Sequence, residues 1–142
     1  MAHPIMFDED DPVLARLRAL CGALPETIEY VSHGRPVFKA GEKGRIFAGY
    51  GAGRRTGSGK GEHVRVDTAL TLRIEDAELP AVDADDRFFV PMYAGTSPWR
   101  ALDLADPRTD WDEVAELIDA SYRLLAPARL VAVLDARPGG DG

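Results

Sequence analysis

The chain has 142 residues, of which 45% are hydrophobic and 29% are charged, and its formal net charge is −7. This is enough for one domain to bury a core without disulfides or a structural metal. Cys21 is the single cysteine and lies among apolar positions of a helical pattern, which predicts a buried, reduced thiol. No apolar run approaches the ~20 residues that span a bilayer. The N-terminal residues also lack the basic start and apolar stretch of a signal peptide, so we expect a cytoplasmic protein.

The first predicted element is a helix at about residues 12–23. Asp11 can accept hydrogen bonds from free backbone N–H groups as the N-cap, and Pro12 suits the first helical turn. Pro25 ends the pattern. Residues 23–30 are predicted to be a connector. The apolar residues at helical spacing are Val13, Leu14, Leu17, Leu20, Cys21 and Leu24.

A β-hairpin and a third strand are predicted next. Residues 36–39 and 45–48 flank a Gly-Glu-Lys-Gly turn, which is typical of a hairpin. Residues 51–61 contain five glycines that leave little to bury, so we expect an exposed, mobile loop. Apolar and polar residues then alternate over residues 64–74, which predicts a strand with one face toward the core. The residues expected on that face are Val64, Val66, Leu70, Leu72 and Ile74.

The remaining pattern predicts two more strands and a long helix. A short acidic helix or turn at residues 75–84 precedes strands at 87–93 and 99–104, which gives a sheet of about five strands. Asp110 can cap the last helix while Glu113 reaches back to it, and Pro127 ends the helix. Its buried face is expected to comprise Trp111, Val114, Ala115, Ile118, Ser121, Tyr122 and Leu125.

The predicted elements give an α+β class, with the last helix covering the sheet. The apolar run at residues 129–134 fits either a strand or a helix. Residues 135–142 are rich in glycine and proline and are predicted to be a disordered tail. The sequence therefore predicts a single domain over residues 1–134.

Positive charge is concentrated in the middle of the chain. Residues 34–65 hold eight basic and two acidic side chains, a formal charge of +6, whereas residues 1–30 sum to −4 and residues 66–142 to −9. Grouped like charges raise the local potential even when the whole molecule is acidic. Such a pattern is what a site for an anionic partner needs, but from the charges alone a solvated basic hairpin without a partner is slightly favoured.

Several short sequences resemble the MmcQ/YjbR family. They are Gly34-Arg-Pro-Val-Phe-Lys39 with Gly44 and Phe47, the strand from Leu70 to Ile74, Trp99, and Glu116-Leu-Ile-Asp-Ala-Ser-Tyr-Arg-Leu124. The resemblance spans about residues 12–126. It implies a CyaY-like fold, in which the N- and C-terminal helices pack on one face of an antiparallel sheet. It also implies a DNA-binding protein with a double-wing motif.

Two features depart from that family pattern. Residues 94–98 are Ala-Gly-Thr-Ser-Pro where the family often has a basic run, so one expected phosphate contact is missing. The loop at residues 51–61 is also longer and richer in glycine than family hairpins usually are. Trp99 is expected to pack in the core or at an edge of the sheet rather than stack on a base.

The resulting hypothesis is DNA binding, in which a basic hairpin and loop contact phosphates and release counterions. The net charge of −7 opposes tight binding, so we expect weak, salt-sensitive affinity. No helix-turn-helix or zinc-finger pattern is present, and no spacing specifies base recognition. The candidate phosphate contacts are Lys39, Lys43, Arg45, Arg54, Arg55, Lys60 and Arg65.

Enzymatic function is not expected. A P-loop would need Gly at Arg54 and Ser or Thr at Gly61, and a dinucleotide fingerprint would need Gly or Ala at Thr56. The three histidines, His3, His33 and His63, lack metal-ligand spacing. The sequence does not exclude a Ser-His-Asp triad, because its members can be distant in sequence and come together only in the folded protein. The sequence predicts no cofactor and no metal.

Two other classes of function remain as alternatives. A CyaY-like fold also serves frataxin-type proteins, which bind iron weakly through carboxylates, and the acidic run at residues 8–11 has suitable oxygens. A cap for the first helix is the simpler role for that run, and Asp83, Asp85 and Asp86 are expected to form a solvated turn. The second alternative is a protein-interaction module that uses the sheet face away from the helices, lined by Arg65, Thr71 and Arg73. The sequence predicts neither the oligomeric state nor the DNA sequence bound.

Overall fold

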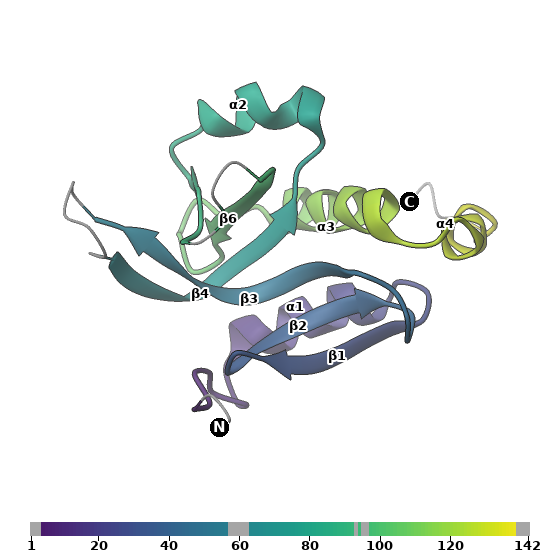
Figure 1. Ribbon diagram of the computed structural model, residues 1–142, viewed down its shortest axis with the longest axis horizontal. Coiled ribbons are helices and arrows are strands. Elements are labelled where there is room, and N and C mark those ends of the chain that lie inside the picture. Colours follow the sequence, from purple (N-terminus) through teal and green to yellow (C-terminus); the bar gives the residue numbers. More distant parts are fainter. Residues whose placement is uncertain (1–3, 57–62, 93, 95–96, 139–142) are drawn as a thin grey trace.

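The computed structural model describes residues 4–56, 63–92, 94 and 97–138. Within these residues the chain forms six strands: β1 (Thr27–Ser32), β2 (Arg35–Ala40), β3 (Ile46–Arg55), β4 (His63–Arg73), β5 (Phe88–Phe89) and β6 (Trp99–Asp103). They pair antiparallel in the order β1-β2-β3-β4-β6-β5 (Figure 1). The helices are α1 (Pro12–Gly22), the 3₁₀ turn η1 (Asp76–Glu78), α2 (Leu79–Asp83), α3 (Trp111–Leu125) and α4 (Ala128–Asp135).

Helices α1 and α3 pack together against one face of the sheet. The main core lies between them and the sheet, and the ring of Phe47 meets that of Tyr122 edge-on, with centroids 5.1 Å apart. Cys21 is buried there as a free thiol, as predicted. The α+β class is confirmed, and the sheet has one strand more than the five expected. Among the described residues, none of the helices is both long and apolar enough to cross a bilayer.

The helix starts follow from their local sequences. Asp11 caps α1 by accepting a hydrogen bond from the N–H of Val13 at 2.8 Å, and Asp110 caps α3 by accepting from the N–H groups of Asp112 and Glu113. The second contact expected of the capping box, from the Glu113 side chain back to Asp110, is wrong. The Glu113 carboxylate accepts hydrogen bonds from Arg87 instead of reaching back to the cap.

The observed elements differ from the predicted ones in several places. Residues 27–30, expected in a connector, belong to the edge strand β1. Residues 51–55, expected in a loop, continue β3, and the rest of that loop from residue 57 lies outside the described residues. The undecided run at residues 129–134 is helical and lies in α4. Of the predicted tail, Asp135 still belongs to α4, and residues 139–142 are not described.

The β3–β4 hairpin changes register halfway along its length. Tyr50 pairs with Leu70, but Ala52 pairs with Val66, so β4 has two extra residues at this point. The expected alternation therefore fails: Val66 packs in a second cluster with Ala52 and Ala69, apart from the main core. The outer end of the hairpin lies at the left of Figure 1, and its residues Gly53 and Arg54 contact the segment that follows β5.

Candidate functional site

The basic residues predicted to contact phosphates separate into two groups at opposite ends of β3. Lys43 and Arg45 lie at the β2–β3 turn, whereas Arg54, Arg55 and Arg65 lie toward the outer end of the β3–β4 hairpin. At ~3.3 Å per strand residue, Arg45 and Arg55 are roughly 30 Å apart. The fold thus divides one basic run of sequence between two surfaces. Lys60, the remaining candidate in the loop, lies outside the described residues.

The group at the β2–β3 turn includes one residue that stabilises its own hairpin. The Nζ of Lys39 donates to the carbonyl of Glu42 at 2.5 Å and lies 5.3 Å from the centroid of the Tyr30 ring. Lys43 and Arg45 are exposed, and neither forms an ion pair with a carboxylate in the described part of the chain. The Lys39 side chain therefore stabilises the turn, while those of Lys43 and Arg45 are accessible to solvent.

The group at the hairpin end is held by the segment that follows β5. Arg54 pairs with Pro91 through the backbone, and its guanidinium carbon lies 5.1 Å from the centroid of the Phe89 ring. Met92 donates its N–H to the carbonyl of Gly53 at 2.9 Å. Arg54 and Arg55 are both exposed. Because consecutive strand residues point to opposite faces, they present positive charge on both sides of the hairpin.

Arg65 lies nearer the base of the hairpin, where it shares a carboxylate with Arg35 of β2. Its Nε donates to Oδ1 of Asp67 at 3.1 Å, and the same oxygen is 3.6 Å from Nη1 of Arg35. Burial lowers the pKa of Arg35; Asp67 opposes this change and the like charge of Arg65 adds to it. Sequence reasoning did not select Arg35 as a site residue. Its proximity to Arg65 depends on the pairing of β2, β3 and β4, for which no local motif exists.

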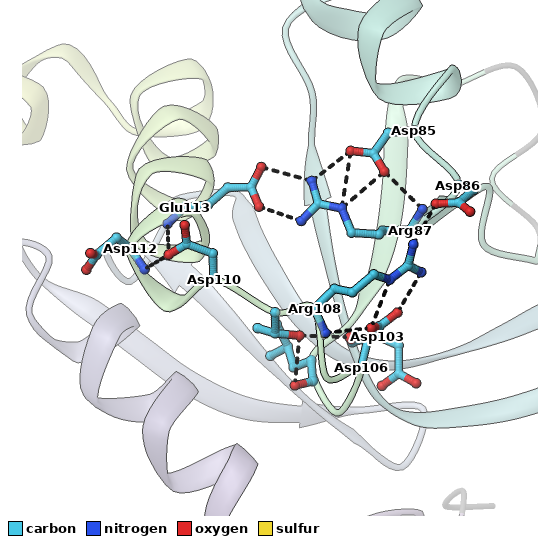
Figure 2. A network of polar contacts seen from close by, with 11 residues as sticks. Asp85, Asp86, Arg87, Asp103, Asp106, Arg108, Asp110, Asp112 and Glu113 are labelled. Carbon is cyan, nitrogen blue, oxygen red and sulfur yellow. Dashed lines mark hydrogen bonds and ion pairs between the residues drawn. The ribbon is translucent and has the colours of Figure 1, made fainter.

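Arginines outside residues 34–65 are mostly engaged by carboxylates. Figure 2 shows Arg87 between Asp85 and Glu113, at 2.7 and 2.8 Å, and Arg108 beside Asp86 and Asp106, at 2.8 and 2.9 Å. In the described chain seven such arginines form ion pairs with carboxylates: Arg18, Arg73, Arg87, Arg100, Arg108, Arg123 and Arg129. The exposed arginines at the hairpin end, Arg54 and Arg55, have no such ion pair among the described residues.

The same ion pairs engage the acidic residues expected to form a solvated turn. Asp83, Asp85 and Asp86 each contact an arginine, and hydrogen bonds from Arg100 and Arg87 lower the pKa of Asp83 and Asp85 respectively. Within the described ranges, no group of three His, Cys, Asp or Glu side chains is placed to hold a metal ion.

The N-terminal acidic run is used structurally. Asp11 caps α1 and accepts a hydrogen bond from the Tyr50 hydroxyl at 2.5 Å. Glu9 forms an ion pair with Arg18 at 2.9 Å, and Asp8 accepts from the N–H of Asp10. The carboxylates in this run therefore fix the start of α1.

The sheet face away from the helices holds part of the predicted interaction surface. Thr71 and Arg73 alternate along β4 with the core-facing Leu72, so they lie on the outer face. Trp99 pairs with Arg73 across the strands and lies on the same face. Trp99 is half-buried, in keeping with packing at the surface of the sheet. Arg73 forms an ion pair with Asp76 at 3.4 Å.

The comparison with known protein families gives one match. A family model, YjbR, matches residues 22–124 of the 142 in the chain. No curated protein matches the chain. The matched range runs from the last residue of α1 to near the end of α3 and contains every strand of the sheet. It covers well over half of the sequence, and the chain belongs to the YjbR family.

Proposed function

We propose that this protein binds nucleic acid through the outer end of the β3–β4 hairpin, with Arg54 and Arg55 as phosphate contacts and Arg65 nearer the base. The observation that supports this most directly is the exposure of Arg54 and Arg55 at the outer end of the hairpin, without an ion pair to a described carboxylate. Most arginines elsewhere are neutralised by carboxylates. Positive charge left unpaired at an exposed edge is suited to a polyanion.

The physical basis of the binding is electrostatic. A two-stranded ribbon fits the major groove of DNA, and arginines on both of its faces can reach phosphates on either side. Each neutralised phosphate releases counterions, so affinity falls as salt rises. Because the arginines lack an arrangement for reading base edges, the proposed binding is independent of sequence. The net charge of −7 keeps it weak.

This proposal is narrower than the seven-residue prediction made from the sequence. Lys39 stabilises its own turn, and Lys43 and Arg45 lie roughly 30 Å from the hairpin end at ~3.3 Å per strand residue. Lys60 stays a predicted contact. We assign no enzymatic role and no cofactor, and the proposed location is the cytoplasm, which suits a chain whose cysteine is free and buried.

Fluorescence anisotropy with a short labelled DNA duplex tests the proposal. The double variant Arg54→Ala/Arg55→Ala removes two phosphate contacts, so we expect affinity to fall about tenfold in ~50 mM salt and the slope of log K against log salt to become shallower by about 1.8. Lys43→Ala/Arg45→Ala is the matched control, since it removes the same charge at the other end of β3. We expect the control to change affinity by less than about threefold.

Two results would remove the proposal. One is the absence of duplex binding by the unaltered protein at low salt. The other is an equal loss of affinity in both double variants, because net charge rather than the hairpin end would then account for the binding.

A further inference from the structure

A pocket of about 610 Å³ lies where the N-terminal segment, the β1–β2 turn and the outer half of the β3–β4 hairpin meet. Its polar lining includes Arg35, Arg65, His33 and His63, and its apolar lining includes Met6 and Met92. This volume is within the range of pockets that bind small organic molecules, about 300–1,000 Å³. Two guanidinium groups beside an apolar wall favour a ligand with an anionic group on an organic body.

The positive charge in the pocket is only partly balanced. Arg35 and Arg65 share one carboxylate, that of Asp67, and Arg65 also donates to the carbonyl of Met6 at 3.4 Å. Two guanidinium groups have ten N–H donors, which exceed what one carboxylate and one carbonyl can accept. A third acceptor group with several oxygens would use the remaining donors.

Arg35 is the more constrained of the two arginines. Its side chain is 16% exposed, and its buried Nη1 has no hydrogen-bond partner among the described residues. The guanidinium lies directly over Gly51, where a Cβ would come within 2.0 Å of Nη1. Such a buried cation with an unsatisfied donor is costly, and the like charge of Arg65 adds to that cost. An anion bound beside the two arginines would offset their like charge, whereas Nη1 itself is buried against Gly51.

We infer that this pocket binds a phosphate monoester of nucleotide size, with its phosphate oxygens near Arg35 and Arg65 and its organic portion against Met6 and Met92. Guanidinium groups match phosphate geometry through paired hydrogen bonds. The inference extends beyond the proposed interface at Arg54 and Arg55, although both use Arg65. The same phosphate group could belong to a free mononucleotide or to the 5′ end of a nucleic-acid strand.

Isothermal titration calorimetry with adenosine 5′-monophosphate, and with adenosine as the comparison, tests this inference. We expect the monophosphate to bind and adenosine to bind at least about tenfold more weakly, because only the former can use the guanidinium groups. Arg65→Gln should weaken monophosphate binding at least about tenfold. Arg45→Gln is the matched control: it removes the same charge at the other end of β3, away from the pocket lining, and the dissociation constant should stay within about twofold.

A second arm uses a labelled single strand with and without a 5′-phosphate. A gain in affinity from the 5′-phosphate that Arg65→Gln abolishes supports the pocket with a strand end as its ligand. Monophosphate binding without that gain supports the pocket with a free nucleotide. Loss of duplex binding in Arg54→Ala/Arg55→Ala with nucleotide binding retained would separate this site from the proposed interface.

Three results would overturn the inference. The first is the absence of binding of both the monophosphate and the 5′-phosphorylated end. The second is equal binding of adenosine and its monophosphate. The third is an equal effect of Arg65→Gln and Arg45→Gln in variants whose thermal unfolding midpoints match that of the unaltered protein.

Discussion

At the scale of single residues, Ser121 connects helix α3 to two strands of the sheet. Its hydroxyl donates to the carbonyl of Phe47 at 2.6 Å and accepts from the N–H of Arg73 at 3.1 Å. Phe47 is the extra residue where the register of β2 and β3 shifts. The next residue, Tyr122, donates its hydroxyl to the carbonyl of Pro25 at 2.6 Å. Together these two side chains fix α3 to the sheet and to the chain before β1.

Replacing Ser121 with alanine should lower the free energy of unfolding by about 1–3 kcal/mol, because two buried main-chain groups would lose their partner. Urea unfolding followed by circular dichroism measures this change. Ala120→Ser, at an exposed position of the same helix, should stay within about 0.5 kcal/mol of the unaltered protein. A loss below about 0.5 kcal/mol for Ser121→Ala would contradict the assigned role.

At the scale of elements, Arg87 connects the start of β5 with the first turn of α3 (Figure 2). Its side chain is 19% exposed and donates to both oxygens of Glu113 as well as to Asp85. Arg87→Met should therefore cost about 2 kcal/mol of unfolding free energy near pH 7. Arg108→Met is the control, since Arg108 is 54% exposed and exposed ion pairs contribute at most about 1 kcal/mol. Equal losses in the two variants would contradict a specific connection through Arg87.

The same contact predicts a dependence on pH. The Arg87 side chain lowers the pKa of Asp85 below its unfolded value of about 3.9, so ionised Asp85 stabilises the fold above that pH. This contribution is lost as the pH falls through the lowered folded-state pKa. Between pH 5 and 2, the free energy of unfolding of Arg87→Met should therefore fall by less than that of the unaltered protein. Urea unfolding over this pH range measures it, and identical pH dependence in the two proteins would contradict the assignment.

The elements that could be predicted from sequence are those with local signals. Asp11 and Asp110 cap their helices within three residues, and the β2–β3 turn contains its own glycines. The extension of β3 through residue 55 had no such signal, because Gly51 there has a φ of 97° and makes room for Arg35 of a neighbouring strand. Strand β1 is an edge strand with three exposed residues, so its alternation is weak. The extension of β3 depends on its pairing with β4 and on the backbone contact with Pro91, whereas β1 pairs with the adjacent β2.

At the scale of the whole molecule, the candidate site was predicted only in part. The concentration of charge in residues 34–65 is a property of the sequence, but an extended strand carries residues ten apart to opposite ends of the sheet. Arg54, Arg55 and Arg65 are near one another because β3 and β4 pair. The pocket between Arg35 and Arg65 required the register of three strands, which the basic run alone does not contain.

The C-terminal helix α4 lies beyond the family match, which ends at residue 124, yet it completes the fold. Leu130 is fully buried in the main core. Arg129 forms an ion pair with Glu26 at 2.8 Å, so α4 also holds the turn before β1. Residues 127–135 are therefore part of the same folded unit as the sheet.

A chain that ends at residue 126 should consequently be less stable than the full chain. Leu130→Ala alone is expected to lower the unfolding free energy by about 2–4 kcal/mol, because it removes buried methyl groups and leaves a cavity, and the truncation should cost at least as much. Val133→Ala, at a position that is 48% exposed on the same helix, should change it by less than about 0.5 kcal/mol. Urea unfolding of the three variants measures these differences. Equal stability of the truncated and full chains would mean that α4 only rests on a domain already complete at α3.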